Sequence, residues 1–275
     1  LIIGIGSISK KHIHAIKKNI KNPVIFGLRS DKLNHNKIKG VQNIFQISEI
    51  DSVIDFVIIS NPTYLHYQSI ISSLSLNCPL FIEKPVLSSL ENNSNITSLI
   101  KKSGIKTYVA CNLRFHPLLN FLKNFLKNKI NNINEINVYC GSFLPDWRKE
   151  LDFRKSYSSN SKMGGGVHLD LIHELDYCVW IFGHPNKTHR NQRSVSNLNI
   201  DSIDSASFIL EYNNFNININ LNYYRVDPKR EIEILLDNET LKGDLLNNSL
   251  KSLKSNKIIF KSQFNIIDTY VSQMK

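Results

Sequence analysis

Short apolar runs alternate with amphipathic stretches from the start of the chain to about Cys111. The runs are almost wholly apolar, which is typical of strands buried on both faces of a parallel sheet. The stretches between them repeat apolar residues at helical spacing. The expected strands are Ile2–Ile5, Val24–Leu28, Phe56–Ile59, Leu80–Ile82 and Thr107–Cys111, and the expected helices are Ser9–Asn19, Tyr64–Leu76 and Ser88–Lys102. This alternation predicts an α/β domain whose parallel sheet is covered by helices on both faces.

The rest of the chain has a different pattern. From Phe215 to Tyr223 every second residue is apolar and the residues between are asparagines, which is the period of a strand with one buried face. A long helix is expected over Val167–Phe182, with Gly183 as its stop. Further expected elements are a helix at Pro117–Asn128 and strands at Ile136–Phe143, Ser205–Tyr212, Glu231–Leu236 and Lys257–Lys261. The pattern predicts an α+β domain with a mostly antiparallel open sheet, so that residues 1–111 form one domain and residues 112–275 the other.

The composition narrows the class of protein. Of 275 residues, 41% are hydrophobic and 21% are charged, which is enough apolar surface for a sizeable core. No run approaches the ~18 apolar residues of a membrane span, so no membrane partner is expected. The net charge of +11 comes from lysines scattered along the chain rather than gathered with aromatic residues. Nucleic acid is therefore not an expected partner.

Cysteine usage indicates the compartment. The four cysteines lie far apart and none forms a Cys-x-x-Cys pair, so neither a disulfide framework nor a zinc site is expected. A reducing cytoplasm is the simplest location. The chain begins inside an expected strand at Leu1 and ends inside a helix-like run, Ile266–Met274. We therefore expect it to be a fragment at both ends.

A glycine-rich turn follows the first expected strand. Gly4-Ile5-Gly6-Ser7-Ile8-Ser9 leads directly into the first helix. In dinucleotide-binding folds the first glycine permits the tight turn, and the second lets the backbone approach a pyrophosphate at the helix N-terminus. The third position holds Ser9, which is small enough for close packing of helix on strand. The strand–turn–helix context predicts a Rossmann domain that binds its cofactor through Gly4, Gly6, Ser7 and Ile8.

The tip of the second strand indicates which cofactor. Enzymes that use NAD usually carry an acidic residue there, which accepts hydrogen bonds from the ribose hydroxyls. This chain has Arg29 and Ser30 instead, and a guanidinium with a hydroxyl suits a 2′-phosphate. The tip favours NADP over NAD. In the alternative, Arg29 stacks on the adenine and Asp31 serves the ribose.

Polar residues also follow the next two buried strands. Ser60-Asn61-Pro62 comes after one strand and Glu83-Lys84-Pro85 after the other. Both lie at the carboxyl edge of the expected sheet, where ligands of open α/β folds bind. We expect both segments to contribute to the cofactor site. The alternative for Glu83 and Lys84 is a salt-bridged strand end with no chemistry.

A third constellation lies at the long helix of the second domain. Three glycines, Gly164–Gly166, permit close approach of a flat ligand, and Asp170 and His173 follow at a spacing of three that places them on one helix face. A carboxylate beside an imidazole is typical of a poised general base. No metal site is expected, because His168 and Asp170 do not face together, and Tyr177 stands where a zinc-protease motif needs its second histidine.

Together these motifs resemble the Gfo/Idh/MocA family of NAD(P)-dependent oxidoreductases over nearly the whole chain. The motifs are the glycine turn with His12, Asn61-Pro62 with His66, Glu83-Lys84-Pro85, Arg114-Phe115 and the block Gly164–His173. Leu144–Arg148 and Arg154–Tyr157 are similar to a branch associated with surface-glycan and nonulosonic-sugar biosynthesis. The family commonly spaces its Asp and His by four residues, whereas here the spacing is three.

The resemblance implies roles for individual residues. Lys84 would touch both the nicotinamide ribose and a substrate hydroxyl, His173 would be the general base, and Asp170 would bind or orient the substrate. His66 and Glu83 join the cofactor site, and Arg114, Trp147 and Arg148 are the candidates for the substrate side. The family also implies a homo-oligomer formed through the C-terminal sheet.

The expected activity is hydride transfer between NAD(P), with NADP preferred, and a hydroxyl or keto group of a sugar or sugar derivative. A protein of another class would keep the glycine turn without the chemistry. Such a non-catalytic NAD(P)-binding sensor or scaffold would not need Lys84 and His173, and both are present.

Overall fold

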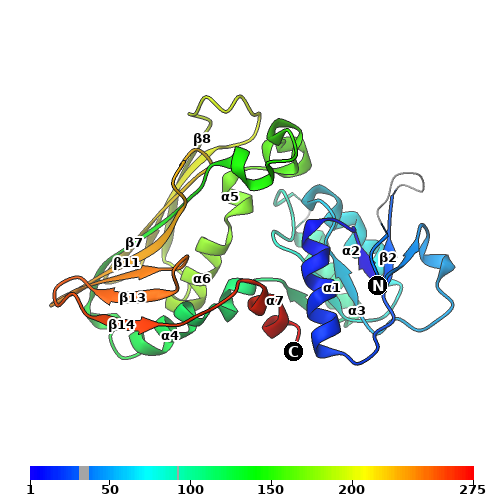
Figure 1. Cartoon of the computed structure of the whole chain (residues 1–275), viewed down its shortest axis with the longest axis horizontal. Helices are drawn as coiled ribbons and strands as arrows, with labels where there is room; N and C mark the ends of the chain where they lie inside the picture. Colours follow the sequence, from blue (N-terminus) through cyan, green and yellow to red (C-terminus); the bar gives the residue numbers. More distant parts are fainter. Residues whose placement is uncertain (31–36, 92) are drawn as a thin grey trace. The chain divides into compact units, whose positions relative to one another are not determined.

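The computed structural model describes residues 1–30, 37–91 and 93–275, and the chain divides into two compact units (Figure 1). The first unit comprises Leu1–Asn112 together with Ile267–Lys275, and the second comprises Leu113–Ile266. Each unit has its own sheet and its own hydrophobic core. None of the helices in the described ranges has the length and apolar character needed to cross a membrane.

The first unit is built on a six-stranded parallel sheet of order β3-β2-β1-β4-β5-β6. The chain runs outward from β1 to β3 and then returns to β4 beside β1, which makes the gap between β1 and β4 the topological switch point. The predicted parallel α/β sheet is confirmed. The strands are β1 Ile2–Ile3, β2 Phe26–Leu28, β3 Gln42–Ile44, β4 Val57–Ile59, β5 Leu80–Ile82 and β6 Thr107–Val109.

Helices cover both faces of this sheet. They are α1 (Ser7–Asn19), α2 (His66–Leu74) and α3 (Asn93–Ser103). The alternation of side chains along β4 separates two cores, because neighbouring residues of a strand point to opposite faces. Val57 and Ile59 join the core under α2 and α3, whereas Ile58 joins the core under α1.

A helix from the end of the chain completes the first unit. α7 (Ile267–Gln273) packs along α1 (Figure 1). Asn19 donates a hydrogen bond from Nδ2 to the carbonyl of Val271 at 2.9 Å, and Asn112 donates from Nδ2 to Thr269 Oγ1 at 2.7 Å. The sequence assigned everything from residue 112 onward to the second domain, and the structure differs in placing this helix with the first unit.

The second unit is built on an eight-stranded sheet of order β14-β13-β12-β11-β7-β10-β9-β8. Every neighbouring pair is antiparallel except β7 and β10, so the predicted mostly antiparallel sheet is confirmed. The strands are β7 Ile133–Gly141, β8 Lys187–Arg193, β9 Ser205–Glu211, β10 Asn216–Asn222, β11 Lys229–Leu236, β12 Thr240–Asp244, β13 Ser249–Ser252 and β14 Ile258–Lys261.

One face of this sheet carries the core. Ile217, Ile219 and Leu221 of β10 are buried there, with leucines of α4 (Pro117–Leu126) packed in the same cluster. The asparagines between them lie on the other face, where Asn218 Nδ2 donates to Asn137 Oδ1 at 3.1 Å and Ser207 Oγ donates to Asn220 Oδ1 at 2.8 Å. The period-two pattern of β10 therefore separates a buried apolar face from a polar face, as predicted.

The prediction of one long helix over residues 167–182 is wrong in one respect. It is two helices, α5 (Val167–Asp170) and α6 (His173–Phe182), separated at Leu171 and Ile172. Leu171 leaves helical geometry with a φ of −99° and a ψ of 27°. Asp170 thus ends one helix and His173 begins the next, so the argument that they share a face of one helix does not hold.

Candidate active site

A pocket of about 510 Å³ opens at the carboxyl ends of β1, β2 and β4, which is the switch point of the first unit. The glycine turn forms one wall, and the segments that follow β2 and β4 form others. The lining residues are Ile3, Gly4, Ile5, Gly6, Leu28, Arg29, Ser30, Phe45, Ser60, Asn61, Pro62, Leu65, Gln68 and Ser69. Sequence motifs that are separated along the chain therefore meet in one pocket.

The glycine turn fits a dinucleotide. Gly4 has a φ of +88°, and a Cβ there would lie 2.4 Å from the Cα of Asn61, so no larger residue is tolerated. A Cβ on Gly6 would meet nothing within 4 Å, which leaves its backbone open to a ligand. Gly6 is the N-cap of α1, and no described side chain caps that end. The exposed N–H groups of the first turn suit a pyrophosphate.

Ser9 is at the position of the third glycine. It is fully buried, and its Oγ donates to the carbonyl of Gly6 at 2.7 Å. The small side chain both packs against the sheet and ties the first helical turn to the glycine turn. Ser7 and Ile8 form the start of α1, as the motif predicts.

The tip of β2 presents Arg29 and Ser30 to the pocket. Arg29 donates from Nε to Asn43 Oδ1 at 2.7 Å, and Asn43 is the central residue of β3. Asn43 was missed by the sequence analysis, because the strand that carries it was not expected. Asp31, the alternative ribose ligand, lies outside the described residues.

The segment after β4 is tied to the glycine turn and to α2. Ser60 Oγ donates to the carbonyl of Gly4 at 2.9 Å, and Asn61 Nδ2 donates to Ser69 Oγ at 2.8 Å. His66, at the start of α2, has its Nε2 2.9 Å from the carbonyl oxygen of Asn61 and its Nδ1 3.0 Å from that of Pro85. Burial lowers the pKa of His66. This imidazole therefore connects the segments that follow β4 and β5.

The Glu83-Lys84-Pro85 turn lies at the carboxyl end of β5, one strand beyond the pocket. Glu83 is only 6% exposed. One of its oxygens lies 2.6 Å from Nε2 of the fully buried His12, and the other accepts the backbone N–H of Lys84 at 3.1 Å. At this strand end the Glu83 carboxylate is therefore held by an imidazole and a backbone amide.

In the second unit, Gly164–Gly166 lie against the loop that precedes them. A Cβ on Gly165 would come within 2.3 Å of the carbonyl oxygen of Tyr157, and Gly166 has a φ of +131°. Tyr157 also donates its hydroxyl to the carbonyl of Gly164 at 2.7 Å. Packing of backbone on backbone therefore requires glycine here, a reason that the sequence analysis did not foresee.

Asp170 and His173 flank the break between α5 and α6. His173 is 8% exposed. Asp170 accepts a hydrogen bond from the hydroxyl of Tyr223 at 2.5 Å, and Tyr223 is fully buried at the end of β10. Burial, followed by the charge of Asp170, raises the pKa of Tyr223 well above its usual value, so the hydroxyl keeps its proton and donates. Tyr223 had been assigned only to a strand.

The three candidates for the substrate side have different surroundings. Arg114 donates from Nε and Nη2 to the two carboxylate oxygens of Asp176 at 3.0 and 2.6 Å, so its guanidinium is committed to an ion pair. Trp147 donates from Nε1 to Ser142 Oγ at 2.8 Å, packs edge-on against Tyr223 at 5.3 Å, and keeps 39% of its surface exposed. Arg148 lies beside it in the same short helix, η5 (Leu144–Arg148).

A buried ion pair behind His173 was also missed. Glu174, fully buried on α6, accepts from Nε and Nη2 of Arg230 on β11 at 2.6 and 3.1 Å. The pair fixes α6 to the sheet directly after His173. Within residues 1–30, 37–91 and 93–275, no group of three or more His, Cys, Asp or Glu side chains is arranged to hold a metal ion.

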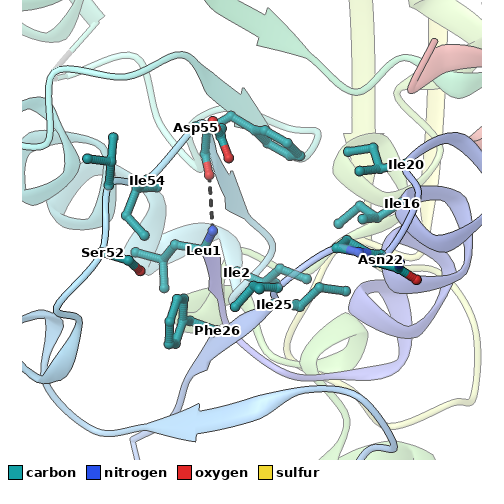
Figure 2. Close-up of a pocket in the computed structure, with 14 residues that line it drawn as sticks. Leu1, Ile2, Ile16, Ile20, Asn22, Ile25, Phe26, Ser52, Ile54 and Asp55 are labelled. Carbon is teal, nitrogen blue, oxygen red and sulfur yellow. Dashed lines mark hydrogen bonds between the residues drawn. The ribbon is translucent and has the colours of Figure 1, made fainter.

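A second pocket of the first unit, of about 370 Å³, lies at the opposite edge of the sheet (Figure 2). Its lining is mainly apolar, with Ile2, Ile16 and Ile25 among the side chains, and the amino group of Leu1 donates to the carbonyl of Phe56 at 3.0 Å. Ligands of open α/β sheets bind at the carboxyl ends of the strands. We therefore place the chemistry at the glycine turn and not here.

The glycine cradle at the switch point and the second, mostly antiparallel unit are the arrangement expected of a two-domain dinucleotide-binding protein. Family comparison agrees: residues 1–111 match the NAD-binding Rossmann fold of an oxidoreductase family, and residues 123–257 match its C-terminal alpha/beta domain. The chain belongs to the Gfo/Idh/MocA family.

Two curated relatives are dehydrogenases of small cyclic polyols or sugars. Glucose-6-phosphate 3-dehydrogenase of Bacillus subtilis is 24% identical over 216 residues, which covers 76% of this chain and 61% of that protein. Myo-inositol 2-dehydrogenase of Thermotoga maritima is 25% identical over 191 residues, 66% of this chain and 54% of that protein. The chain thus spans a little over half the length of these relatives.

Solved structures share the fold. UDP-N-acetylglucosamine 3-dehydrogenase GnnA from Acidithiobacillus ferrooxidans matches with a TM-score of 0.75 and 15% identity, covering 99% of this chain and 86% of that one. The WlbA dehydrogenase from Bordetella pertussis, in complex with NADH and UDP-GlcNAcA, matches with a TM-score of 0.77 and 15% identity, covering 99% and 81%.

Proposed function

We propose that this protein catalyses reversible hydride transfer between NAD(P) and a hydroxyl or keto carbon of a sugar or sugar derivative. The observation that supports this most strongly is in the first unit. A glycine-lined pocket at the switch point adjoins a strand end at which buried histidines contact the residues on both sides of Lys84. A site that only bound a nucleotide would have no need to fix a lysine at that strand end.

Lys84 is proposed to polarise the reacting oxygen. Gly4, Gly6, Ser7, Ile8, Ser60, Asn61 and Pro62 would hold NAD(P), which would supply the acceptor or donor of the hydride. Lys84 contacts the nicotinamide ribose and donates to the substrate oxygen, which stabilises the negative charge that develops there. A positively charged donor makes hydrogen bonds roughly twice as strong as a neutral one.

His173 is proposed to be the general base. In the oxidation direction it takes the proton of the substrate hydroxyl, a contribution typically worth about 10²–10⁴-fold in rate. Its low exposure supports this role, because a buried imidazole exchanges protons with a bound substrate rather than with bulk water. Asp170 binds or orients the substrate, and the hydroxyl of Tyr223 holds one of its oxygens.

The preferred cofactor is proposed to be NADP. Arg29 and Ser30 line the pocket at the tip of β2, and the hydrogen bond from Arg29 Nε to Asn43 Oδ1 helps to orient the guanidinium. Two charge-assisted bonds to a 2′-phosphate suit that geometry. The alternative is NAD, with Asp31 as the ribose ligand.

The substrate is proposed to be a sugar, and more specifically a nucleotide-linked or acidic sugar. Trp147 offers a partly exposed ring for stacking on a sugar, and Arg148 offers a guanidinium for a carboxylate or phosphate. Arg114 contributes indirectly, through Asp176 on α6. Two structural neighbours are a UDP-N-acetylglucosamine 3-dehydrogenase, GnnA, and a WlbA dehydrogenase in complex with UDP-GlcNAcA, and such substrates suit the surface-glycan branch.

Assembly and location are proposed from the second unit and the cysteines. The outer face of the eight-stranded sheet carries hydrogen-bonding side chains such as Asn137, Asn218 and Asn220, and a second copy is proposed to pair with this face. Cys78, Cys111, Cys140 and Cys178 are free, which suits the cytoplasm.

The direct test is nicotinamide absorbance at pH 7–8 with NADP or NAD and a panel of hexoses, inositols, UDP-amino sugars and their uronic acids. Turnover of at least one sugar is expected, and Lys84→Ala should reduce it by several orders of magnitude. Tight NADPH binding without turnover of any sugar would favour the non-catalytic sensor instead. Unchanged turnover in Lys84→Ala would remove that lysine from the reaction.

Cofactor choice is tested separately, by calorimetric titration of NADP and NAD. Bonds to a charged group are worth on the order of 1–3 kcal/mol, so NADP should bind roughly ten- to a hundredfold more tightly. Arg29→Asp should reverse the preference, because a carboxylate repels the phosphate and accepts the ribose hydroxyls. Tighter binding of NAD by the wild-type protein would contradict the role of Arg29.

A further inference from the structure

The Lys84 turn is held by a hydrogen-bonded chain that begins on α1. His12 Nε2 lies 2.6 Å from Glu83 Oε1 although the two residues are 71 positions apart, and both are buried. Glu83 Oε2 in turn accepts the backbone N–H of Lys84 at 3.1 Å. The carboxylate is therefore engaged at both oxygens, with an imidazole on one side and the peptide of the proposed catalytic lysine on the other.

The orientation of the His12 ring is fixed by its surroundings. The ring packs edge-on against Phe81 of β5 at 5.3 Å and against Tyr270 of α7 at 5.7 Å. Its Nδ1 is buried and finds no hydrogen-bond partner among the described residues. A proton on Nδ1 would be an unsatisfied buried donor, so Nε2 carries the proton and donates to Glu83.

The charges around the carboxylate favour the same arrangement. Lys11 precedes His12 on α1, and its Nζ lies 4.9 Å from the centroid of the Tyr270 ring. Burial lowers the pKa of Lys11, while the charge of Glu83 opposes that shift. Glu83 thus has the charge of Lys11 in its electrostatic surroundings, besides Lys84 next to it in the sequence.

The far side of the turn is held independently. His66 contacts the carbonyl oxygens of Pro85 at 3.0 Å and Val86 at 3.2 Å through Nδ1. His12 and His66 come from α1 and α2, which cover opposite faces of the sheet. The turn is therefore anchored from both faces, and His12 is hydrogen-bonded to the residue immediately before Lys84.

We infer that His12 is a positioning residue for Lys84, which acts by fixing the Glu83 carboxylate that holds the Lys84 peptide. The inference rests on the proposed function of Lys84. It assigns to α1 a second task besides the cofactor pyrophosphate: the helix that begins at the glycine turn also sets the place of the lysine at the neighbouring strand end. Glu83 is the link between the two.

The first test follows the backbone and needs no substrate. Hydrogen exchange of the Lys84 amide is measured by NMR on protein labelled with ¹⁵N-lysine, in the wild type, His12→Leu and His12→Gln. Leucine keeps the apolar packing but cannot donate, whereas glutamine places an N–H near the position of Nε2. We expect exchange at Lys84 to accelerate about tenfold or more in His12→Leu, the scale of one lost buried hydrogen bond, and to stay within about threefold in His12→Gln.

Two further variants make this measurement decisive. His14→Leu changes an exposed histidine of the same helix and should leave Lys84 exchange unaltered. If His12→Leu does not fold, His12→Asn takes its place. The asparagine amide is too short to reach Glu83, so exchange at Lys84 should accelerate as expected for His12→Leu. Unaltered Lys84 exchange in a folded His12→Leu or His12→Asn protein would overturn the inference.

The second test uses turnover, with any sugar that the absorbance panel finds to be oxidised. His12→Leu should lower kcat by roughly 10–100-fold, because a displacement of about 1 Å at a reacting group has that scale of effect, while the KM for NADP changes less than about threefold. His12→Gln should restore most of kcat. A rise in KM with kcat unchanged would assign His12 to cofactor packing instead. If no sugar is oxidised, the proposed function fails, and the exchange measurement still decides whether His12 fixes the Lys84 turn.

Discussion

Charged residues of the second unit find partners far away in the chain. Asp176 pairs with Arg114, Glu174 pairs with Arg230, and Asp170 accepts from Tyr223. These three acidic residues lie within seven positions of one another, yet each has a partner from a different element. Burial makes the pairing of Glu174 with Arg230 obligatory, because an unpaired buried charge is costly to desolvate.

Replacement of His173 by alanine should remove the proton acceptor of the reaction. We expect kcat to fall by about 10²–10⁴-fold, the usual contribution of a general base, with little change in cofactor binding. The measurement is the pH–rate profile with the sugar found in the absorbance panel. In the wild type, one limb of the pH–rate profile reflects protonation of the general base. In His173→Ala that limb should be absent. A variant that keeps the same limb would show that another group takes the proton.

Tyr223→Phe removes a single hydroxyl from a buried position. The variant leaves one oxygen of Asp170 without its donor, which should lower the free energy of unfolding by roughly 1–3 kcal/mol. Turnover should fall more than cofactor affinity, because Asp170 loses its fixed orientation. Chemical denaturation and steady-state kinetics measure the two effects. Tyr224→Phe, at the exposed neighbouring position, is the control, and equal effects of the two changes would refute the role of Tyr223.

At the scale of secondary-structure elements, the sequence predicts those helices and strands whose apolar residues recur with a regular period. Apolar or alternating segments such as β4 and β10 were placed correctly, because burial of one or both faces leaves a clear pattern. Strands without such a pattern were not: β3, β8, β12 and β13 are held mainly by backbone pairing to neighbours. Such pairing depends on the rest of the sheet, so it leaves little trace in the local sequence.

The same division applies to the site. Residues whose side chains repeat a motif, among them Gly4, Asn61 and Lys84, could be named from sequence, and the pocket gathers the first two. Asn43, Tyr223 and the His12–Glu83 bond could not be, because each arises from long-range contacts rather than spacing. The helix break after Asp170 also had no signal except the shortened Asp–His interval.

His116 makes the second unit sensitive to acid. Burial lowers its pKa to about 4 at the start of α4, where the ring packs edge-on against Phe264 and Nε2 lies 3.2 Å from the carbonyl oxygen of Leu245. An unfolded histidine titrates near 6.5. Between these pH values the unfolded chain binds the extra proton, so the free energy of unfolding should fall as the pH drops from about 6.5 to about 4, by up to about 3 kcal/mol.

Urea denaturation at several pH values between 7 and 4 checks this prediction. In His116→Phe, which keeps an aromatic ring, the part of the slope due to His116 should vanish. His184→Gln changes an exposed histidine and should retain the wild-type slope. An unchanged pH dependence in His116→Phe would assign the acid sensitivity to other groups.

α7 is expected to contribute directly to the stability of the first unit. Thr269→Val keeps the shape of a fully buried side chain but leaves the Nδ2 of Asn112 without its acceptor. We expect a loss of roughly 1–3 kcal/mol in the free energy of unfolding. Thr97→Val, on the exposed face of α3, is the matched control and should cost well under 1 kcal/mol. Similar losses in the two variants would mean that the Asn112–Thr269 hydrogen bond adds nothing to the free energy of unfolding.

At the scale of the whole molecule, each unit has a separate core, and the cofactor pocket is lined by residues of the first unit. NADP binding should therefore slow amide exchange in residues 1–112 and 267–275 more than in residues 113–266. At a concentration a hundred times its Kd, a ligand stabilises the state that binds it by about 2.7 kcal/mol. Exchange followed by mass spectrometry with and without NADP measures this. Equal protection of both units would contradict a pocket that belongs to the first.

Because α7 belongs to the first unit, that unit is assembled from two stretches separated by the whole of the second. A ribosome adds about 5–20 residues per second, so α7 emerges on the order of ten seconds after the strands and helices that it completes. During that interval the second unit is released in full, while Thr269 and Tyr270 are still missing from the surface of α1. The order of synthesis thus favours completion of the second unit before the first, which still lacks the Tyr270 ring that packs on His12.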